Sequence, residues 1–257
     1  MNYGIGKHLL SVLKNVVLGA ALWLLVVPPA TAQEPLTLVA DEWPPFSGGD
    51  LPELGIAMDV TKSVLTRAGY EVEAAILPWP RIVHGAKTAE YDIVTSLFLD
   101  AEMQEFVHYS DPFYDTEIRF VQKTGGDARY DGLQSLTDYT IAVGAGFLYE
   151  PAFDAAGFLN KFEVTTTFQG LQMVAAGRVD LTLDSVDVVR HSILRGDPAL
   201  MDQIEVLDPP LATQQVHMAV SLSRPDHLRV VADFNRTLAE MRADGSLADL
   251  LAKHGVN

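Results

Sequence analysis

Short apolar runs alternate with amphipathic stretches along most of the chain, a pattern typical of an α/β protein. We predict strands where apolar residues run together or alternate between turn residues, at 36–40, 71–77, 92–95, 117–122, 140–143, 179–183 and 217–221. We predict helices where apolar residues recur at helical spacing, at 59–68, 82–88, 147–156, 168–176, 186–194 and, as one or two helices, across 225–251. The polar stretch 123–132 is a connector after which a second part of the fold would begin.

The N-terminus has the pattern of an export signal. Lys7 and Lys14 make a basic start, an apolar run follows at 16–27, and a small-x-small cleavage site ends at Ala32. The alternative, an uncleaved membrane anchor, fits less well because the run is shorter than the ~20 apolar residues that span a bilayer. We therefore predict that residues 1–32 are a signal peptide, cleaved after Ala32, and that the remaining chain is periplasmic.

Composition excludes several classes of protein. With 34 acidic against 18 basic residues the formal net charge is −16, which argues against binding to nucleic acid or to anionic lipid. The chain has no cysteine, so disulfides, thiolate nucleophiles, cysteine zinc sites and a lipid anchor at the cleavage site are all excluded. A 48% hydrophobic composition can supply the sizeable core that an exported, disulfide-free protein needs.

No catalytic motif stands out in the chain. There is no Ser-His-Asp order, nucleotide-binding glycine loop or metal-type histidine pair, and the seven histidines are dispersed. Asp41, Glu42 or Asp184 could serve as a general acid or base, but the pattern does not single one out. We predict that the chain is not an enzyme and uses no cofactor or metal.

Two segments carry a family resemblance: 91–114, YDIVTSLFLDAEMQEFVHYSDPFY, and WPPF at 43–46. Both resemble segments of the family 3 extracytoplasmic solute-binding proteins of polar amino-acid ABC transporters. That family reads roughly D-x-I-I-x-x-x-x-T-x-E-R and then F-S-x-P-Y in the longer segment. This chain keeps Asp92 and Glu102, but Met103 stands where the family carries the arginine that grips a ligand's carboxylate.

Two later motifs extend the resemblance over nearly the whole exported chain: GRVD at 177–180 and MRADGSLADLLAKHG at 241–255. It implies a two-lobed periplasmic-binding-protein-like (Venus-flytrap) fold with two crossover hinge strands. Lobe 1 would comprise 33–121 and 217–257, and lobe 2 would comprise 122–216. Ligand would close the cleft by binding the closed state better.

The resemblance also places aromatic residues at the ligand. Trp43 lies where the family sets a ring over the ligand, Phe46 belongs to the same motif, and Trp79 lies at the opposing apolar face. Two indoles could sandwich an aliphatic, aromatic or cationic group; the alternative is packing in the core or exposure at the rim. Arg81, in P-W-x-R, is a candidate to replace the grip lost at Met103, because guanidinium groups bind carboxylates bidentately. A surface or lobe-internal salt bridge is the competing interpretation.

The remaining expected contacts lie on one loop of lobe 1 and on lobe 2. Ser96, Phe98 and Met103 belong to the loop that presents backbone groups and small hydroxyls to the ligand. Ser96 fits that role, whereas Phe98 and Met103 indicate a more apolar pocket or simple packing. Gly146 matches a glycine before a helix N-terminus that can hold an anion. The last set of lobe 2 candidates comprises Phe147, Tyr149, Asp184 and Ser185. Asp184 and Ser185 are alternatives for one amine-binding position, and the sequence leaves that choice open.

The function that the resemblance implies is periplasmic solute capture. The ligand would be small and polar or amphiphilic: amino-acid-like, an amine or an aromatic acid. The partner would be an ABC permease in the inner membrane, and the receptor itself is expected to be a monomer. The alternatives are a periplasmic enzyme of the cyclohexadienyl-dehydratase type and a ligand-presenting partner of a membrane sensor.

Overall fold

The computed structural model describes residues 34–256, so the predicted signal peptide at 1–32 lies outside the described residues. Across 34–256, no helix combines the length and the apolarity that crossing a bilayer requires.

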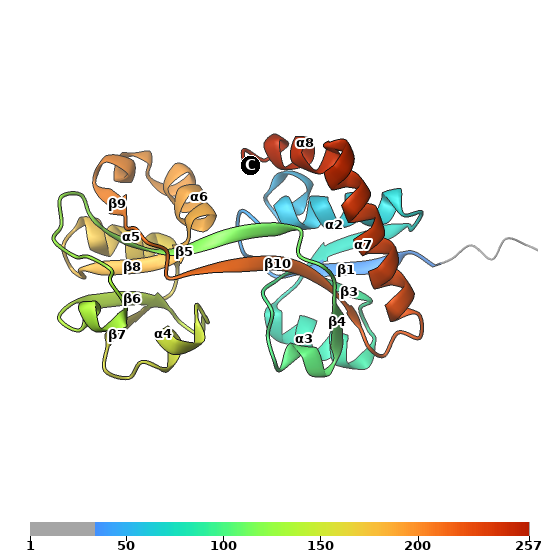
Figure 1. Ribbon diagram of the computed structural model, residues 1–257, viewed down its shortest axis with the longest axis horizontal. Coiled ribbons are helices and arrows are strands. Elements are labelled where there is room, and N and C mark those ends of the chain that lie inside the picture. Colours follow the sequence, from blue (N-terminus) through green and yellow to red (C-terminus); the bar gives the residue numbers. More distant parts are fainter. Residues whose placement is uncertain (1–33, 257) are drawn as a thin grey trace, which may run out of the picture. The chain divides into compact units, whose positions relative to one another are not determined.

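Ten strands occur in the described part of the chain, and hydrogen bonds join them in the order β2-β1-β3-β10-β5-β8-β6-β7, with β4 on β10 and β9 on β5 (Figure 1). Their bounds are β1 Leu36–Ala40, β2 Val72–Ile76, β3 Ile93–Leu97, β4 Val107–Tyr109, β5 Tyr114–Lys123, β6 Thr140–Gly144, β7 Asn160–Val164, β8 Leu181–Ser185, β9 Ile204–Val206 and β10 Ala212–Ser221. The α-helices are α2 Ile56–Arg67, α3 Trp79–Thr88, α4 Pro151–Ala155, α5 Thr167–Ala175, α6 Val186–Gly196, α7 His227–Asp244 and α8 Ser246–Lys253.

In the first half of the sheet, the central strands β1 and β3 are buried on both faces. β1 pairs in parallel with β2 and β3, and its alternating side chains enter two different apolar clusters. Leu38 joins the cluster under α2, α7 and α8, and Val39 joins the cluster under α3. α2 packs there because Ile56, Val60 and Val64 recur every four residues and form one buried stripe.

The second half repeats this layering around β6, which pairs in parallel with β7 and β8. Ile141 enters a cluster with Phe153 of α4, while Ala142 enters the cluster formed with Leu171 of α5 and Ile193 of α6. Strands buried on both faces between helices are typical of parallel α/β sheets.

Two long antiparallel strands, β5 and β10, connect these halves. Tyr114–Ile118 pairs with Ala212–Val216; beyond that stretch β10 pairs with β3 and β5 pairs with β8 (Figure 1). The result is the two-lobed periplasmic-binding-protein fold with two crossover strands. The lobe boundaries near 121 and 216 remain a prediction.

The structure corrects one predicted helix. The helix expected at 147–156 begins only at Pro151, because the Glu150 side chain accepts from the Phe153 N–H and caps the first turn there. Gly146 therefore lies inside a turn, closed by a hydrogen bond of 3.1 Å from the Phe147 N–H to the Gly144 carbonyl, and not directly before a helix N-terminus. The strands β4, β7 and β9 were not predicted from the sequence.

Candidate functional site

A cavity of about 380 Å³ opens at the carboxyl ends of β1 and β2. Its lining residues directly follow the two strands: Asp41, Glu42, Ile76, Leu77, Pro78 and Trp79. The strands are parallel, so both end at the same edge of the sheet, and the Leu77 N–H donates to the Ala40 carbonyl at 2.9 Å. Ligands of open α/β sheets bind in such crevices beyond the carboxyl ends of strands.

The lining combines two carboxylates with one indole. Burial raises the pKa of the Asp41 carboxyl, and the charge of neighbouring Glu42 raises this pKa further, against a backbone hydrogen bond that lowers it. The Glu42 carboxylate accepts the Gly49 N–H at 2.9 Å. Trp79 is 39% exposed, so part of its ring is free for contact. No basic side chain lines this cavity, which therefore favours a cationic group.

Arg81 makes its polar contacts on its own lobe. Its guanidinium lies 3.4 Å from the Glu90 carboxylate and 5.8 Å from the ring centroid of Tyr91. Glu90 also accepts the Tyr91 hydroxyl at 2.8 Å. The arginine side chain is 59% exposed, so this ion pair contributes little stability. Its proposed gripping role remains a hypothesis.

The other lobe 1 aromatics gather in one cluster. Trp43 lies 4.4 Å from Phe46 and 5.0 Å from Phe98, measured between ring centroids, and the Phe98 contact is edge-on. Phe46 is fully buried and also contacts Tyr114. The Trp43 Nε1 atom is buried and lacks a hydrogen-bond partner among the described residues. A buried indole N–H usually has a hydrogen-bond partner, so this donor is an exception among the described residues.

Ser96 and Met103 differ in what they can offer a ligand. Ser96 is buried with φ +63°, a left-handed conformation that is uncommon for residues other than glycine, and its Oγ lacks a partner within 34–256. Such backbone strain clusters at functional sites. Met103 is 4% exposed and belongs to the core cluster with Ile82 and Val107. In this structure its side chain serves packing.

On lobe 2, the Phe147 ring is half exposed and stacks on Tyr149 at 6.3 Å between ring centroids. Tyr149 is buried, and its hydroxyl accepts the Gly144 N–H at 2.7 Å. Gly146 has φ +75° and open space around it. The exposed ring next to this loop leaves an apolar surface that a ligand could cover.

Asp184 and Ser185, the two alternatives for the amine-binding position, are both buried. Asp184 accepts the Thr167 hydroxyl and the Ser185 N–H; burial raises the pKa of its carboxyl to about 6 despite those two bonds. Ser185 accepts the Asp187 N–H at 3.2 Å as the cap of α6 and shares a 2.6 Å hydrogen bond with Thr116.

The structure thus brings the expected residues into separate groups. One group joins Trp43, Phe46 and Phe98, another joins Phe147 and Tyr149, and Trp79 lies with two carboxylates that the ligand prediction omitted. The positions of Asp41 and Glu42 could have been predicted from the sequence, because acidic residues directly after a parallel strand lie at the edge of the sheet where ligands bind.

The family model described as bacterial extracellular solute-binding proteins, family 3, matches residues 36–257. The arginine-binding extracellular protein ArtP of Bacillus subtilis (strain 168) is 23% identical over 209 residues, which are 78% of this chain and 77% of ArtP. Both are described as binding proteins and not as enzymes.

Solved structures share the fold. A histidine kinase sensor domain with similarity to periplasmic binding proteins matches with a TM-score of 0.71 and 17% identity, covering 86% of this chain and 96% of that domain. The ancestral amino acid-binding protein AncCDT-1, a precursor of cyclohexadienyl dehydratase, matches with a TM-score of 0.66 and 21% identity, covering 85% and 94%. At these identities the likeness concerns the fold alone.

Proposed function

The chain belongs to family 3 of the bacterial extracellular solute-binding proteins, and from that premise we propose that it captures a small cationic, amino-acid-like solute in the periplasm for an ABC permease. Of the ligand classes expected from the sequence, we therefore favour those with a positively charged end. An ordinary α-amino acid without a basic side chain is a weaker fit, because the carboxylate-gripping arginine is replaced by Met103.

The observation that carries the proposal is the cavity lined by Asp41, Glu42 and Trp79. A cation over an indole gains from the ring's negative face, and two carboxylates can accept its N–H donors. The net charge of −16 adds attraction for a cation at long range. The arginine-binding description of ArtP agrees with this ligand class.

The fold supplies a way to couple binding to movement. Only β5 and β10 run from one sheet half into the other, among the elements of 34–256. A ligand that contacts both lobes would favour the closed arrangement by its extra contacts there. The permease would then recognise the loaded receptor.

The test is a calorimetric and thermal-shift comparison of solutes. L-arginine, L-lysine and the diamine putrescine are compared with L-glutamate and L-phenylalanine. We expect the cations to raise Tm by mass action and the other two to leave it unchanged. Each charged hydrogen bond is worth about 1.5–3 kcal/mol, so Asp41→Asn with Glu42→Gln should weaken binding about tenfold or more. Asp202→Asn, at an exposed position on lobe 2, is the matched control.

The Arg81→Ala variant distinguishes binding of the ligand's carboxylate from binding of its cationic end. If Arg81 grips a carboxylate, this variant loses affinity for arginine and keeps its affinity for putrescine. Stabilisation by glutamate or phenylalanine alone would refute the cationic ligand. No shift with any solute would count against transport and favour the enzyme or sensor-partner alternatives.

A further inference from the structure

Two histidines far apart in the sequence meet on lobe 1. His108 is the middle residue of β4 and pairs with Val220 of β10, while His227 is the first residue of α7. Their ring centroids lie 5.8 Å apart, with 54° between the ring planes, and both side chains are half-buried. The two imidazoles therefore come from separate, well-anchored elements.

The ring of His227 is held in one tautomer. Its Nδ1 lies 2.8 Å from the Arg224 carbonyl oxygen, which can only accept, so Nδ1 carries the proton and Nε2 keeps its lone pair in the neutral ring. Metal-binding histidines almost always donate their second ring N–H in this manner, commonly to a backbone carbonyl. His227 is thus prepared to bind a metal through Nε2.

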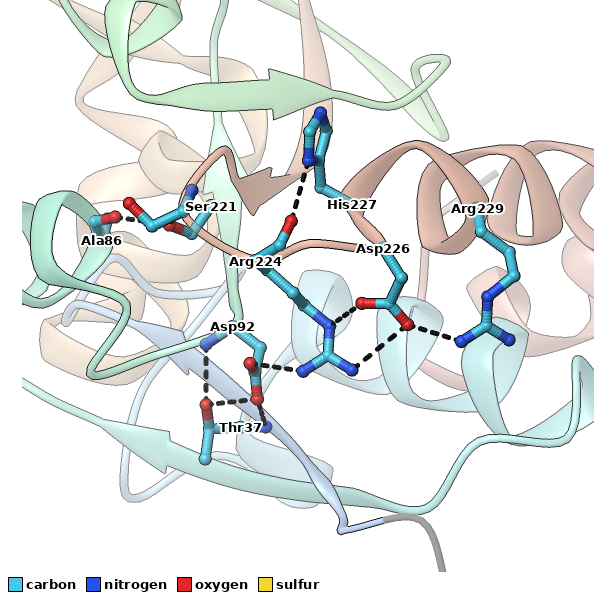
Figure 2. Close-up of polar contacts among 9 residues, drawn as sticks. Thr37, Ala86, Asp92, Ser221, Arg224, Asp226, His227 and Arg229 are labelled. Carbon is cyan, nitrogen blue, oxygen red and sulfur yellow. Dashed lines mark hydrogen bonds and ion pairs between the residues drawn. The ribbon is translucent and has the colours of Figure 1, made fainter.

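An ion-pair network fixes the carbonyl that orients this ring (Figure 2). The Arg224 guanidinium lies 2.7 Å from Asp92 and 2.6 Å from Asp226, and Asp92 in turn accepts the Thr37 N–H at 2.9 Å. Asp226 also pairs with Arg229. The two arginines are matched by two aspartates, so the network adds no net positive charge that would repel a cation.

A cavity of about 360 Å³ lies beside His108 and shares no lining residue with the candidate solute cavity. Gln104, Val107, Tyr109 and Leu222 complete its lining. Zinc–imidazole bonds are ~2.0–2.1 Å long, which places the centroids of two imidazoles on one tetrahedral ion roughly 5–6 Å apart. The observed separation of 5.8 Å matches this requirement.

We propose that His108 and His227 bind a divalent first-row transition-metal ion. Imidazole nitrogen suits Zn²⁺, Ni²⁺ and Cu²⁺, and copper should bind most tightly. Among residues 34–256, no group of three or more His, Cys, Asp or Glu side chains could hold a metal. The site therefore supplies two nitrogens, and water completes the coordination. Sequence spacing gave no sign of it, since fold topology alone brings the two rings together.

The test is a copper titration of the chelator-treated protein, followed by calorimetry and by electron paramagnetic resonance. We expect one dominant site with nitrogen hyperfine structure. His108→Ala and His227→Ala should each weaken it at least tenfold, whereas His84→Ala, at an exposed position of α3, should leave it unchanged. Far-UV circular dichroism verifies that each variant is folded. Asp41→Asn should retain the metal, which separates this site from the solute cavity.

Absence of copper binding by the wild type would overturn the proposal. Equal binding by the doubly substituted protein, His108→Ala with His227→Ala, would also overturn it by placing the metal elsewhere.

Discussion

At the scale of single residues, the Asp184 carboxyl should make stability depend on pH. Burial raises the pKa of this group from an ordinary value near 3.8 to about 6, so the folded state binds its proton more tightly than the unfolded state. Stability should therefore fall as the pH rises from about 4 through 6. With 1.36 kcal/mol per pKa unit, Asp184→Asn should be more stable than the wild type at pH 7.5 by up to about 3 kcal/mol.

Urea unfolding of both proteins at pH 4 and pH 7.5 measures this difference, with the exposed Asp202→Asn as the control. An equal difference between wild type and Asp184→Asn at both pH values would contradict the assignment.

Residue identity was easier to predict than residue environment. Trp43, Phe46 and Phe98 were each expected at the ligand, and the structure shows that their rings contact one another, an arrangement that the sequence did not predict. The Glu90 partner of Arg81 and the core position of Met103 depend on how α3 and the loop after β3 pack, which local sequence does not encode. The unpaired Trp43 Nε1 could be found only once its surroundings were known.

At the scale of elements, one carboxylate fastens the C-terminal helix to α2. Asp59 of α2 accepts from His254 Nε2 at 2.8 Å and from Lys253 Nζ at 3.1 Å. Burial opposes ionisation of Asp59, but these bonds outweigh it, and the pKa of the carboxyl falls below its ordinary value. The stabilisation of the folded state by ionised Asp59 is therefore present above about pH 4, and it is lost as the pH falls through the lowered pKa of the folded state.

Asp59→Ala should therefore cost about 1–3 kcal/mol at pH 6, because it leaves the buried His254 without its acceptor. The cost should shrink as the pH is lowered below 4. Urea unfolding at pH 6 and pH 3 tests this, with Asp50→Ala in an exposed loop as the control. A pH-independent cost would show that packing, and not the charge, fastens the helix.

The clearest elements in the sequence were the amphipathic helices. α2, α5 and α6 lie within a few residues of their predicted bounds, because each buries a stripe at helical spacing. β7 was not predicted because four of its five residues, Asn160–Glu163, are at least partly exposed, so its sequence shows no apolar alternation. β4 and β9 have three residues each, which is too few to show the alternation of apolar and polar residues that marks a strand.

At the scale of the whole molecule, the core of the first lobe draws on both ends of the chain. Leu36 and Leu38 share one cluster with Phe234, Leu238 and Leu251. A chain that stops at Leu222 lacks α7 and α8 and leaves this cluster open. We expect it to lose the cooperative urea transition of the first lobe, as followed by circular dichroism and limited proteolysis. A full-size transition in this fragment would contradict the expectation.

The order of the family-like motifs along the chain predicted the two-lobed architecture. It did not predict the lengths of the two connecting strands. β5 begins three residues before its predicted start and β10 five residues before its own. The added residues are largely polar and carry no apolar period, so the antiparallel pairing of β5 with β10, and not local preference, makes them strand.

The same closure by the C-terminus sets an order of events during synthesis. Among the described elements, β1 and α2 leave the ribosome early, whereas α7 and α8, which complete their core, leave it after all the strands. The second lobe's strands β6, β7 and β8 emerge between them as one uninterrupted stretch and can assemble earlier. The first third of the described chain thus remains without a finished core until α7 and α8 have been synthesised, and until then it is available to factors that bind unfolded polypeptides.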